Sequence, residues 1–201
     1  MSSPLALVPT GTANTASVIA AFRRLGIDPE LTADPEAIES AQHVVLPGVG
    51  SFGAAGATLA KGGLATTLAR RVDEGRPTLA VCVGMQLLAA TSEESPGAGG
   101  LGVVDTVVTR FGNQVRVPQL GWNRVEPHPS ARYLRPGWAY FANSFRFETV
   151  PDGWVPATTD HGGRFVSAME RGEVLACQFH PELSGDWGLS LLERWVSGAD
   201  R

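Results

Sequence analysis

The chain has 201 residues, of which 43% are hydrophobic and 18% charged, a balance typical of a folded domain and not of a disordered chain. Its net charge of −4 and pI near 5.6 exclude a basic nucleic-acid-binding surface as its main feature. No run approaches the roughly 18 apolar residues of a membrane-spanning helix, and residues 1–5 lack the features of a secretory signal. We therefore expect neither a nucleic-acid nor a membrane partner.

The first half alternates short apolar runs with helical patterns. Buried strands are predicted over three segments: 5–8, 44–46 and 78–81. Helices are predicted over three others: the segment that places Val18, Phe22 and Leu25 on one face and ends at Gly26, then 54–74, then 85–90. This β-α-β-α alternation predicts a parallel sheet covered by helices.

The second half is richer in strands joined by turns. Strands are predicted over 102–111, 119–125, 138–147, 165–170 and 173–179, with a hairpin turn at Arg171-Gly172. The spacing of four apolar residues between 186 and 195 predicts a closing amphipathic helix. Since no linker or repeat divides the chain, we expect one α/β domain over 1–201, with a mixed, mostly parallel central sheet flanked by helices.

A cysteine stands where a predicted strand passes into a helix, in Ala80-Val-Cys82-Val-Gly84-Met-Gln86. A sharp strand–turn–helix junction exposes the side chain at its apex, and the helix N-terminus favours a thiolate there. Cys82 is therefore a candidate nucleophile, with a buried structural cysteine as the alternative. The other cysteine, Cys177, lies in a predicted strand, and we expect it to be buried and inert. Two such distant cysteines predict neither a disulfide framework nor a metal site, and they indicate a reduced, cytoplasmic setting.

A second polar cluster follows a predicted strand in Gln178-Phe-His180-Pro-Glu182. A carboxylate two residues after a histidine is able to orient the imidazole, which then serves a nucleophile as a general base. A solvated His-Pro-Glu turn is the alternative. Taken together, the two segments predict a triad of Cys82, His180 and Glu182.

Glycines follow the second predicted strand in Pro47-Gly-Val-Gly-Ser51. Backbone N–H groups at such a turn are able to approach an oxyanion closely, together with the N–H of Val83 that follows the nucleophile. An ordinary glycine-rich connection between a strand and a helix is the alternative.

These motifs resemble the class I glutamine amidotransferases, and within that class the glutaminase subunits of imidazole glycerol phosphate synthase. Cys82 in VCVGMQ and the distant HPE at 180–182 are the features of the class. The narrower resemblance rests on segments that stand in the family's order over nearly the whole chain: PGVGSF (47–52), VCVGMQLL (81–88), SEESPG (92–97), PQLGWN (118–123), YFANSFR (140–146) and QFHPELS (178–184).

The resemblance implies hydrolysis of L-glutamine through a thioester on Cys82, with no cofactor or metal. His180 would act as base and then acid, oriented by Glu182. Gly50, after a peptide reorientation, and Val83 would bind the oxyanion. The substrate would be held by a larger set: Gly48, Gln86, Glu94, Ser144 and Phe145.

The resemblance also implies a partner, a (β/α)₈-barrel cyclase subunit that receives the ammonia in histidine biosynthesis within a heterodimer. The residues expected to face this partner are Asn14, Trp122, Asn123, Tyr140 and Leu183. Three positions depart from the family pattern: Asn143 replaces a histidine, Leu183 replaces a lysine and Ala13 replaces a glycine. None of them belongs to the triad, and all three concern docking and activation.

Three other functions fit part of the pattern. The glutaminase of pyridoxal phosphate synthesis also has HPEL, but it expects a GGES-type loop where this chain has PGVGS. A regulatory pseudo-amidotransferase would not need the intact triad. A free-standing cysteine hydrolase would be fully active without a partner.

Overall fold

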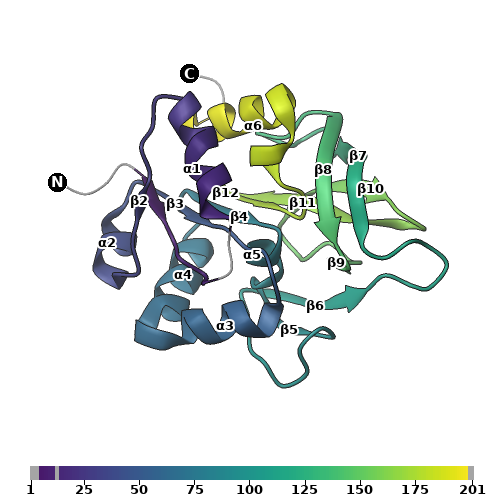
Figure 1. Ribbon diagram of the computed structural model, residues 1–201, viewed down its shortest axis with the longest axis horizontal. Coiled ribbons are helices and arrows are strands. Elements are labelled where there is room, and N and C mark those ends of the chain that lie inside the picture. Colours follow the sequence, from purple (N-terminus) through teal and green to yellow (C-terminus); the bar gives the residue numbers. More distant parts are fainter. Residues whose placement is uncertain (1–4, 12–13, 199–201) are drawn as a thin grey trace.

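The computed structural model describes residues 5–11 and 14–198, and it contains one mixed sheet with helices on both sides (Figure 1). The strands are β1 (Leu5–Leu7), β2 (Glu30–Leu31), β3 (His43–Leu46), β4 (Thr78–Val81), β5 (Ala89–Ser92), β6 (Val104–Arg110), β7 (Gln119–Pro127), β8 (Gly137–Asn143), β9 (Phe145–Phe147), β10 (Val155–Asp160), β11 (Arg164–Arg171) and β12 (Val174–Cys177). The α-helices are α1 (Thr15–Arg24), α2 (Pro35–Ser40), α3 (Phe52–Ala60), α4 (Leu64–Asp73), α5 (Val83–Gln86) and α6 (Gly185–Ser197), and two 3₁₀ turns are η1 (Lys61–Gly63) and η2 (Pro181–Leu183).

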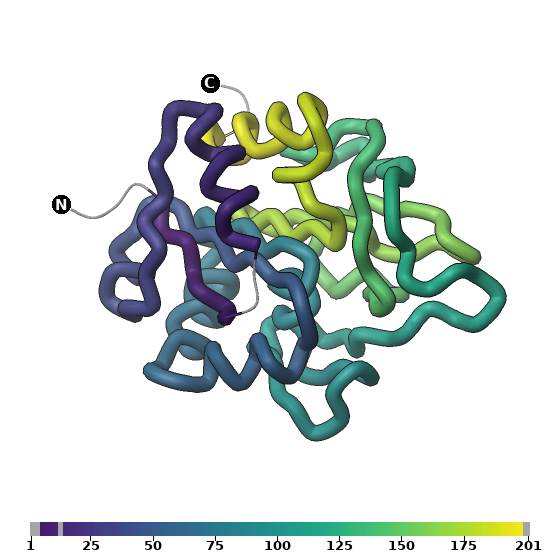
Figure 2. Tube along the Cα trace, in the orientation of Figure 1, coloured from purple at the N-terminus to yellow at the C-terminus, as the bar shows by residue number. Residues whose placement is uncertain are grey.

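The parallel half of the sheet has the order β2-β1-β3-β4-β12. Strands β1, β3, β4 and β12 are buried throughout, as expected for parallel strands covered on both faces. Helices α1 and α6 lie side by side on one face, where the rings of Phe22 and Trp195 meet edge to face (Figures 1 and 2). Helices α3 and α4 lie on the other face, and α2 packs against α4.

The second half continues the sheet with antiparallel strands. From β12 the order runs through β11 and β10 to the β7–β8 hairpin, and β9 connects β11 to the pair β6–β5. The hairpin ends this strand order and lies in the right half of Figure 1. The predicted mixed α/β sheet with flanking helices is thus confirmed.

The boundaries of several predicted elements were wrong. The helix expected over 54–74 is divided between α3 and α4, because Gly62 and Gly63 adopt φ values of 68° and 81°. The helix expected over 85–90 begins at Val83 and ends at Gln86, since Ala89 pairs with the neighbouring strand β6.

Other differences concern single turns and short elements. The strand expected over 138–147 is interrupted at Ser144, and the hairpin turn lies at Gly172-Glu173, one residue later than predicted. Strands β2 and β10 and helix α2 were missed, although Asp34 followed by Pro35 is a helix-start signal. None of the helices in the described part of the chain is long and apolar enough to cross a membrane.

Candidate active site

The three predicted motifs converge because they follow neighbouring parallel strands. Val81 at the end of β4 is in register with Cys177 of β12, and Ala80 is in register with Leu46 of β3. The carboxyl ends of parallel strands meet at one edge of the sheet, which is where ligands bind in open α/β folds. Cys82, the 47–51 loop and His180 therefore meet at this edge.

Cys82 occupies a strained turn between β4 and α5. Its φ of 54° and ψ of −110° make it the one non-glycine residue with positive φ among those described. Such strain is a feature of nucleophile turns. The expected exposure of the side chain was wrong, because Cys82 is only 4% exposed, although it lines a cavity. The turn is held from below, because the Cys82 N–H donates a 2.7 Å hydrogen bond to the Cys177 carbonyl.

Tight backbone packing explains the glycines around this turn. A Cβ on Gly84 would collide with the carbonyl oxygen of Leu46, and a Cβ on Gly48 would lie only 2.5 Å from the Gly84 nitrogen. Only glycine fits at either position without a shift of the backbone. The Pro-Gly loop after β3 therefore packs directly against the nucleophile turn.

The imidazole of His180 is held by a carboxylate from the next turn. Its Nδ1 lies 2.8 Å from Oε1 of Glu182, and both side chains are about 95% buried. The His180 main chain is also fixed, since its N–H donates to the carbonyl of Tyr140 on β8. The Ser184 hydroxyl donates to the His180 carbonyl at 2.6 Å and accepts the Tyr140 N–H. These contacts hold the ring in one orientation.

The surroundings of His180 raise its pKa from 6.5 to about 10. Burial by itself lowers this pKa, but hydrogen bonds to Cys82 and Glu182, together with the negative charges of these two groups, outweigh it. The imidazolium form is therefore favoured beside the sulfur. By contrast, burial raises the pKa of the Cys177 thiol well above its usual value, which supports the expectation that Cys177 is inert.

A cavity of about 200 Å³ opens over the cysteine. Its lining consists of Val49, Gly50, Cys82, Val83, Gln86, Glu94, Ala142, Asn143, Ser144, Phe145 and His180. The structure thus brings together the predicted nucleophile, base and oxyanion residues with four of the five predicted substrate residues. Gly48 is different, because it is buried behind the loop against Val83 and Gly84.

The two predicted oxyanion donors are not both free. The Val83 N–H points at the Gly48 carbonyl, with an N···O distance of 3.4 Å. Gly50 has a φ of 95°, a backbone conformation that favours glycine. A small rearrangement of the 47–50 loop would release the Val83 donor into the cavity.

The polar residues of the cavity are fixed by backbone contacts. Glu94 accepts the N–H of Phe52 at 2.6 Å, which ties its loop to the start of α3. Gln86 is buried, and its amide nitrogen donates to the Phe145 carbonyl at 3.2 Å and to the Gln178 side-chain oxygen at 3.0 Å. Both N–H bonds of this amide are thus in use, so Gln86 has only its oxygen to offer a substrate.

One polar residue beside the sulfur, Gln178, was not predicted from the sequence. Gln178 is completely buried, and its side-chain nitrogen donates to Cys82 Sγ at 3.7 Å. Its signal in the sequence is a glutamine within an otherwise apolar strand end, two residues before His180. Only the pairing of β12 with β4 places it next to the sulfur.

The three departures from the family pattern lie in different places. Asn143 lines the cavity, where its side-chain nitrogen donates to the Phe145 carbonyl at 3.0 Å and its oxygen has no hydrogen-bond partner among the described residues. Leu183 is 40% exposed and borders a groove between α1 and the turn that carries Glu182. Ala13 lies outside the described residues.

The residues expected to face a partner differ in their exposure and in their contacts within the chain. Asn14 is exposed and caps α1, whereas the half-buried Asn123 side chain is engaged within the chain, where it donates to the Asp160 carbonyl. Trp122 is 54% exposed and meets Tyr140 edge to face.

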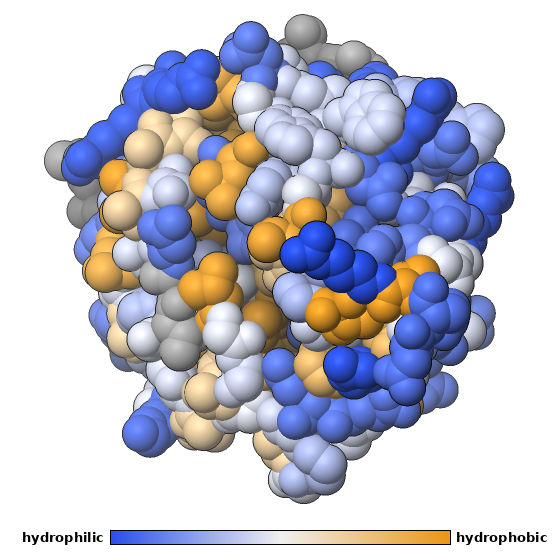
Figure 3. All heavy atoms as spheres, turned by 45° about the vertical axis from the view of Figure 1, so that its right-hand side comes forward, coloured by the Kyte–Doolittle hydropathy of each residue, from blue (hydrophilic) through white to orange (hydrophobic). Residues whose placement is uncertain are grey.

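The outward face of the β7–β8 hairpin also carries two apolar side chains that were not predicted. Leu120 is 64% exposed and Trp138 is 57% exposed, on the same face as Trp122. Figure 3 turns this side of the molecule forward and shows hydrophobic groups among hydrophilic ones around a hollow. We call Leu120, Trp122 and Trp138 the hairpin apolar surface.

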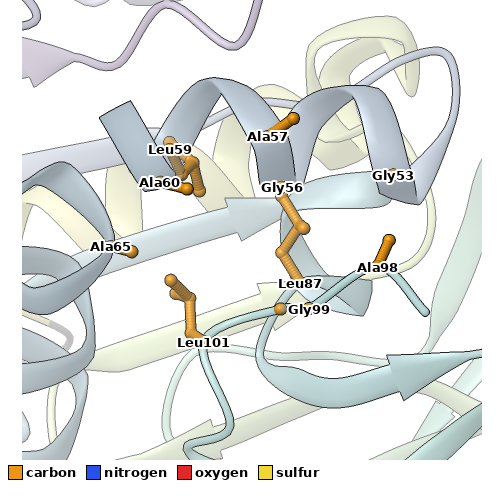
Figure 4. A pocket seen from close by; sticks show the side chains of 11 residues that line it. Gly53, Gly56, Ala57, Leu59, Ala60, Ala65, Leu87, Ala98, Gly99 and Leu101 are labelled. Carbon is orange, nitrogen blue, oxygen red and sulfur yellow. The ribbon is translucent and has the colours of Figure 1, made fainter. Parts of the chain in front are cut away.

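A second cavity, of about 260 Å³, lies away from the cysteine between α3, α4 and the 97–101 loop (Figure 4). Its walls are glycine, alanine and leucine, and Leu87 and Leu101 point into it. It offers no acid, base or nucleophile. The reactive groups are thus found in the cavity over Cys82.

Comparison with known proteins agrees with this geometry. The profile of the family described as glutamine amidotransferase class-I matches residues 6–196. Imidazole glycerol phosphate synthase subunit HisH of Symbiobacterium thermophilum is 40% identical over 195 residues, which cover 95% of this chain and 92% of that protein. The HisH subunit of Methanothermobacter thermautotrophicus is 39% identical, with 96% and 97% covered. The chloroplastic hisHF of Arabidopsis thaliana is 36% identical over 96% of this chain, but over only 34% of its own length.

Solved structures share the fold. A glutamine amidotransferase crystal structure superposes with a TM-score of 0.77 at 24% identity, and covers 97% of this chain and 99% of that one. PurLQS from Thermotoga maritima superposes with a TM-score of 0.74 at 15% identity over the full length of both chains. At these identities the likeness shows the fold alone.

Proposed function

The chain belongs to the class I glutamine amidotransferase family, and within it to the HisH subunits of imidazole glycerol phosphate synthase, and we propose that Cys82, His180 and Glu182 carry its glutaminase activity. The observation that supports this proposal most directly is the 2.8 Å contact between His180 Nδ1 and Glu182, at the sheet edge that also carries the strained Cys82 turn. The three groups have the chemistry of a nucleophile, an acid–base and its orienting carboxylate.

The proposed reaction proceeds in two stages. Cys82 Sγ attacks the carboxamide carbon of L-glutamine, and His180 protonates the departing nitrogen, so that ammonia leaves and a thioester forms. A water molecule then enters, His180 removes its proton, and the thioester breaks to glutamate and the free thiol. Backbone N–H groups of Val83 and the 47–50 loop stabilise the oxyanion of each tetrahedral state.

Substrate selection follows from the groups that remain available in the cavity. The Gln86 side-chain oxygen and the Glu94 carboxylate are acceptors, which suits the ammonium group of an amino acid. Ser144 and Phe145 line one wall of the cavity. We propose that these four residues seat L-glutamine with its amide carbon over Cys82.

We further propose that the ammonia passes to a (β/α)₈-barrel cyclase subunit docked over the site. The hairpin apolar surface, together with Leu183 beside the active-site turn, presents exposed side chains of the kind that protein interfaces cover. The Arabidopsis relative agrees with such a partner, because the region matching this chain is only a third of a longer synthase chain.

The GWN segment, the PGVGS loop and the HisH relatives favour this function over the glutaminase of pyridoxal phosphate synthesis. We propose that the whole chain, 1–201, is one amidotransferase domain. We also propose that the protein acts in the cytoplasm, where reducing conditions keep the Cys82 thiol available.

The test measures glutamate release by the chain reconstituted with the cyclase subunit from the same genome. Cys82→Ala should abolish glutamine hydrolysis, while ammonia-dependent synthesis by the complex persists because only the nitrogen source is lost. Cys177→Ala is the matched control, since this thiol is buried away from the cavity, and it should retain activity. Appreciable glutamine turnover by Cys82→Ala would contradict the proposed nucleophile, and a wild-type complex without turnover would favour a regulatory pseudo-amidotransferase.

A further inference from the structure

Four buried amide and carbonyl groups form a continuous series of hydrogen bonds from Asn143 in the cavity wall to the sulfur of Cys82. The Asn143 side-chain nitrogen donates to the Phe145 carbonyl, which also accepts from Gln86 at 3.2 Å. The same Gln86 nitrogen donates to the Gln178 oxygen at 3.0 Å, and the Gln178 nitrogen donates to Cys82 Sγ at 3.7 Å. Gln178 is thus the last residue in this hydrogen-bonded series before the sulfur.

The direction of these hydrogen bonds is set by the Phe145 carbonyl. A backbone carbonyl only accepts, so the nitrogen of Gln86, and not its oxygen, has to face it. The Gln86 nitrogen also faces Gln178, so the oxygen of Gln178 has to be on that side. This leaves the Gln178 nitrogen, a donor, pointing at the sulfur. If the Gln178 amide were flipped, its nitrogen would face the Gln86 nitrogen, and its oxygen would face the sulfur of Cys82.

We propose that Gln178 is a positioning residue, which holds the Cys82 sulfur toward the cavity and stabilises its negative charge through an N–H donor. This inference rests on the proposed function, because it assigns a residue to the same nucleophile. The donor complements His180, which approaches the sulfur from the HPE turn. Hydrogen bonds to an ionised group are stronger than those between neutral groups, so the contact strengthens as the thiolate forms.

The buried setting makes this donor effective. Gln178 is fully buried and its N–H donates to the Ser167 carbonyl at 2.8 Å, so the β11–β12 pairing fixes its backbone. Its amide cannot turn to water, and a buried donor without a partner is costly. The other titratable groups around Cys82 are His180 and Glu182 on the turn after β12, Glu94 across the cavity and Cys177 on β12.

The test follows the pH dependence of Cys82 alkylation by iodoacetamide in the full-length chain, read by mass spectrometry. Gln178→Met keeps the length of the side chain but removes the donor to Cys82, together with the oxygen that accepts the Gln86 N–H. We expect the pH midpoint of alkylation to rise by about one unit, the change expected for the loss of one weak hydrogen bond to an ion. In the reconstituted complex, kcat should fall by a larger factor than KM for glutamine rises, because Gln86 keeps its hydrogen bond to the Phe145 carbonyl.

Ser167→Ala is the matched control. It changes a buried side chain on the adjoining strand, whose hydroxyl has no hydrogen-bond partner in the part of the chain that the structure describes. It leaves the hydrogen bonds between Asn143, Phe145, Gln86, Gln178 and Cys82 intact. Its alkylation profile should coincide with that of the wild type. A merely structural role for Gln178 would lower the stability of Gln178→Met but leave its alkylation midpoint in place, and that result would overturn the proposal.

A second measurement needs no variant of Gln178. In the ¹⁵N spectrum of the wild-type chain, the Gln178 side-chain amide should titrate with the alkylation midpoint, and in Cys82→Ala it should not. An amide that does not follow the thiol in the wild type would also overturn the proposal. Both readouts are independent of turnover, so a complex that fails to hydrolyse glutamine would contradict the proposed function without deciding the role of Gln178.

Discussion

The N–H of Val83 points at the carbonyl of Gly48, 3.4 Å away, and not into the cavity over Cys82. The donor expected to stabilise the oxyanion is therefore engaged within the chain, in a contact long enough to be exchanged at low cost. The conformation of the PGVG loop is therefore expected to limit the activity of the isolated protein.

We predict that the chain alone is a poor glutaminase and that the ligand-bound cyclase partner raises its turnover. The loss of one oxyanion donor typically costs about 10²–10³ in rate, so a change in the 47–50 loop that releases the Val83 N–H would provide activation of that size. Glutamate production with and without the ligand-bound partner measures the effect. Equal rates would instead indicate a free-standing hydrolase.

A second prediction concerns the pH dependence that Glu182 imposes. Because the pKa of His180 is raised from 6.5 to about 10, its imidazolium stabilises the fold fully below pH 6.5, and this contribution is lost as the pH rises through about 10. Glu182→Gln removes one of the groups that raise the pKa, so the histidine ring should titrate at lower pH, as NMR would show.

The stability of the same variant gives an independent check. The difference in the free energy of unfolding between wild type and Glu182→Gln should narrow as the pH rises from 6.5 toward 10, since the wild type then loses its extra proton. Glutaminase activity should fall less than on loss of Cys82, because Glu182 orients the base without entering the covalent chemistry. An unchanged His180 titration in Glu182→Gln would contradict the assigned contact.

A third prediction tests the packing beneath the nucleophile turn. Gly84→Ala would push a methyl group into the Leu46 carbonyl, and should lower the free energy of unfolding by about 1–3 kcal/mol and displace the sulfur. Gly99→Ala is the matched control, because no atom lies within 4 Å of its added Cβ, and it should change stability by no more than about 0.5 kcal/mol. Urea denaturation compares the two, and equal effects would show that the close approach is unimportant.

A fourth prediction concerns Leu183, which stands where the family pattern has a lysine. We expect a neutral or apolar surface of the cyclase opposite it, so Leu183→Lys should weaken the complex by more than about ten-fold, because burying an unpaired ammonium costs several kcal/mol. Leu31→Lys is a suitable control, since Leu31 is 52% exposed on the edge strand β2, at the far end of the sheet order from the β7–β8 hairpin. Calorimetric titration against the native barrel measures both. Affinity that survives Leu183→Lys would show that Leu183 packs within its own chain and does not report on the interface.

Much of the parallel half of the fold could be predicted because its signals are local. The apolar runs of β1, β3 and β4, the glycine that closes α1 and the spacing of the last helix all lie within a few residues of the features they predict. The helix expected over 85–90 failed for the opposite reason. Its residues continue an apolar pattern, but Ala89 belongs to a strand whose partner Val104 is distant in the sequence.

The sequence by itself determined the chemical groups: a cysteine after one strand, a His-Pro-Glu turn after another and a glycine loop after a third. The tertiary structure decided how those groups meet. The register between β4 and β12 places Gln178 next to the sulfur, and the Gly48 carbonyl engages the N–H of Val83, the proposed oxyanion donor. Neither contact has a local signature, because a buried hydrogen bond depends on which strands become neighbours, and burial of apolar surface over the whole chain selects those neighbours.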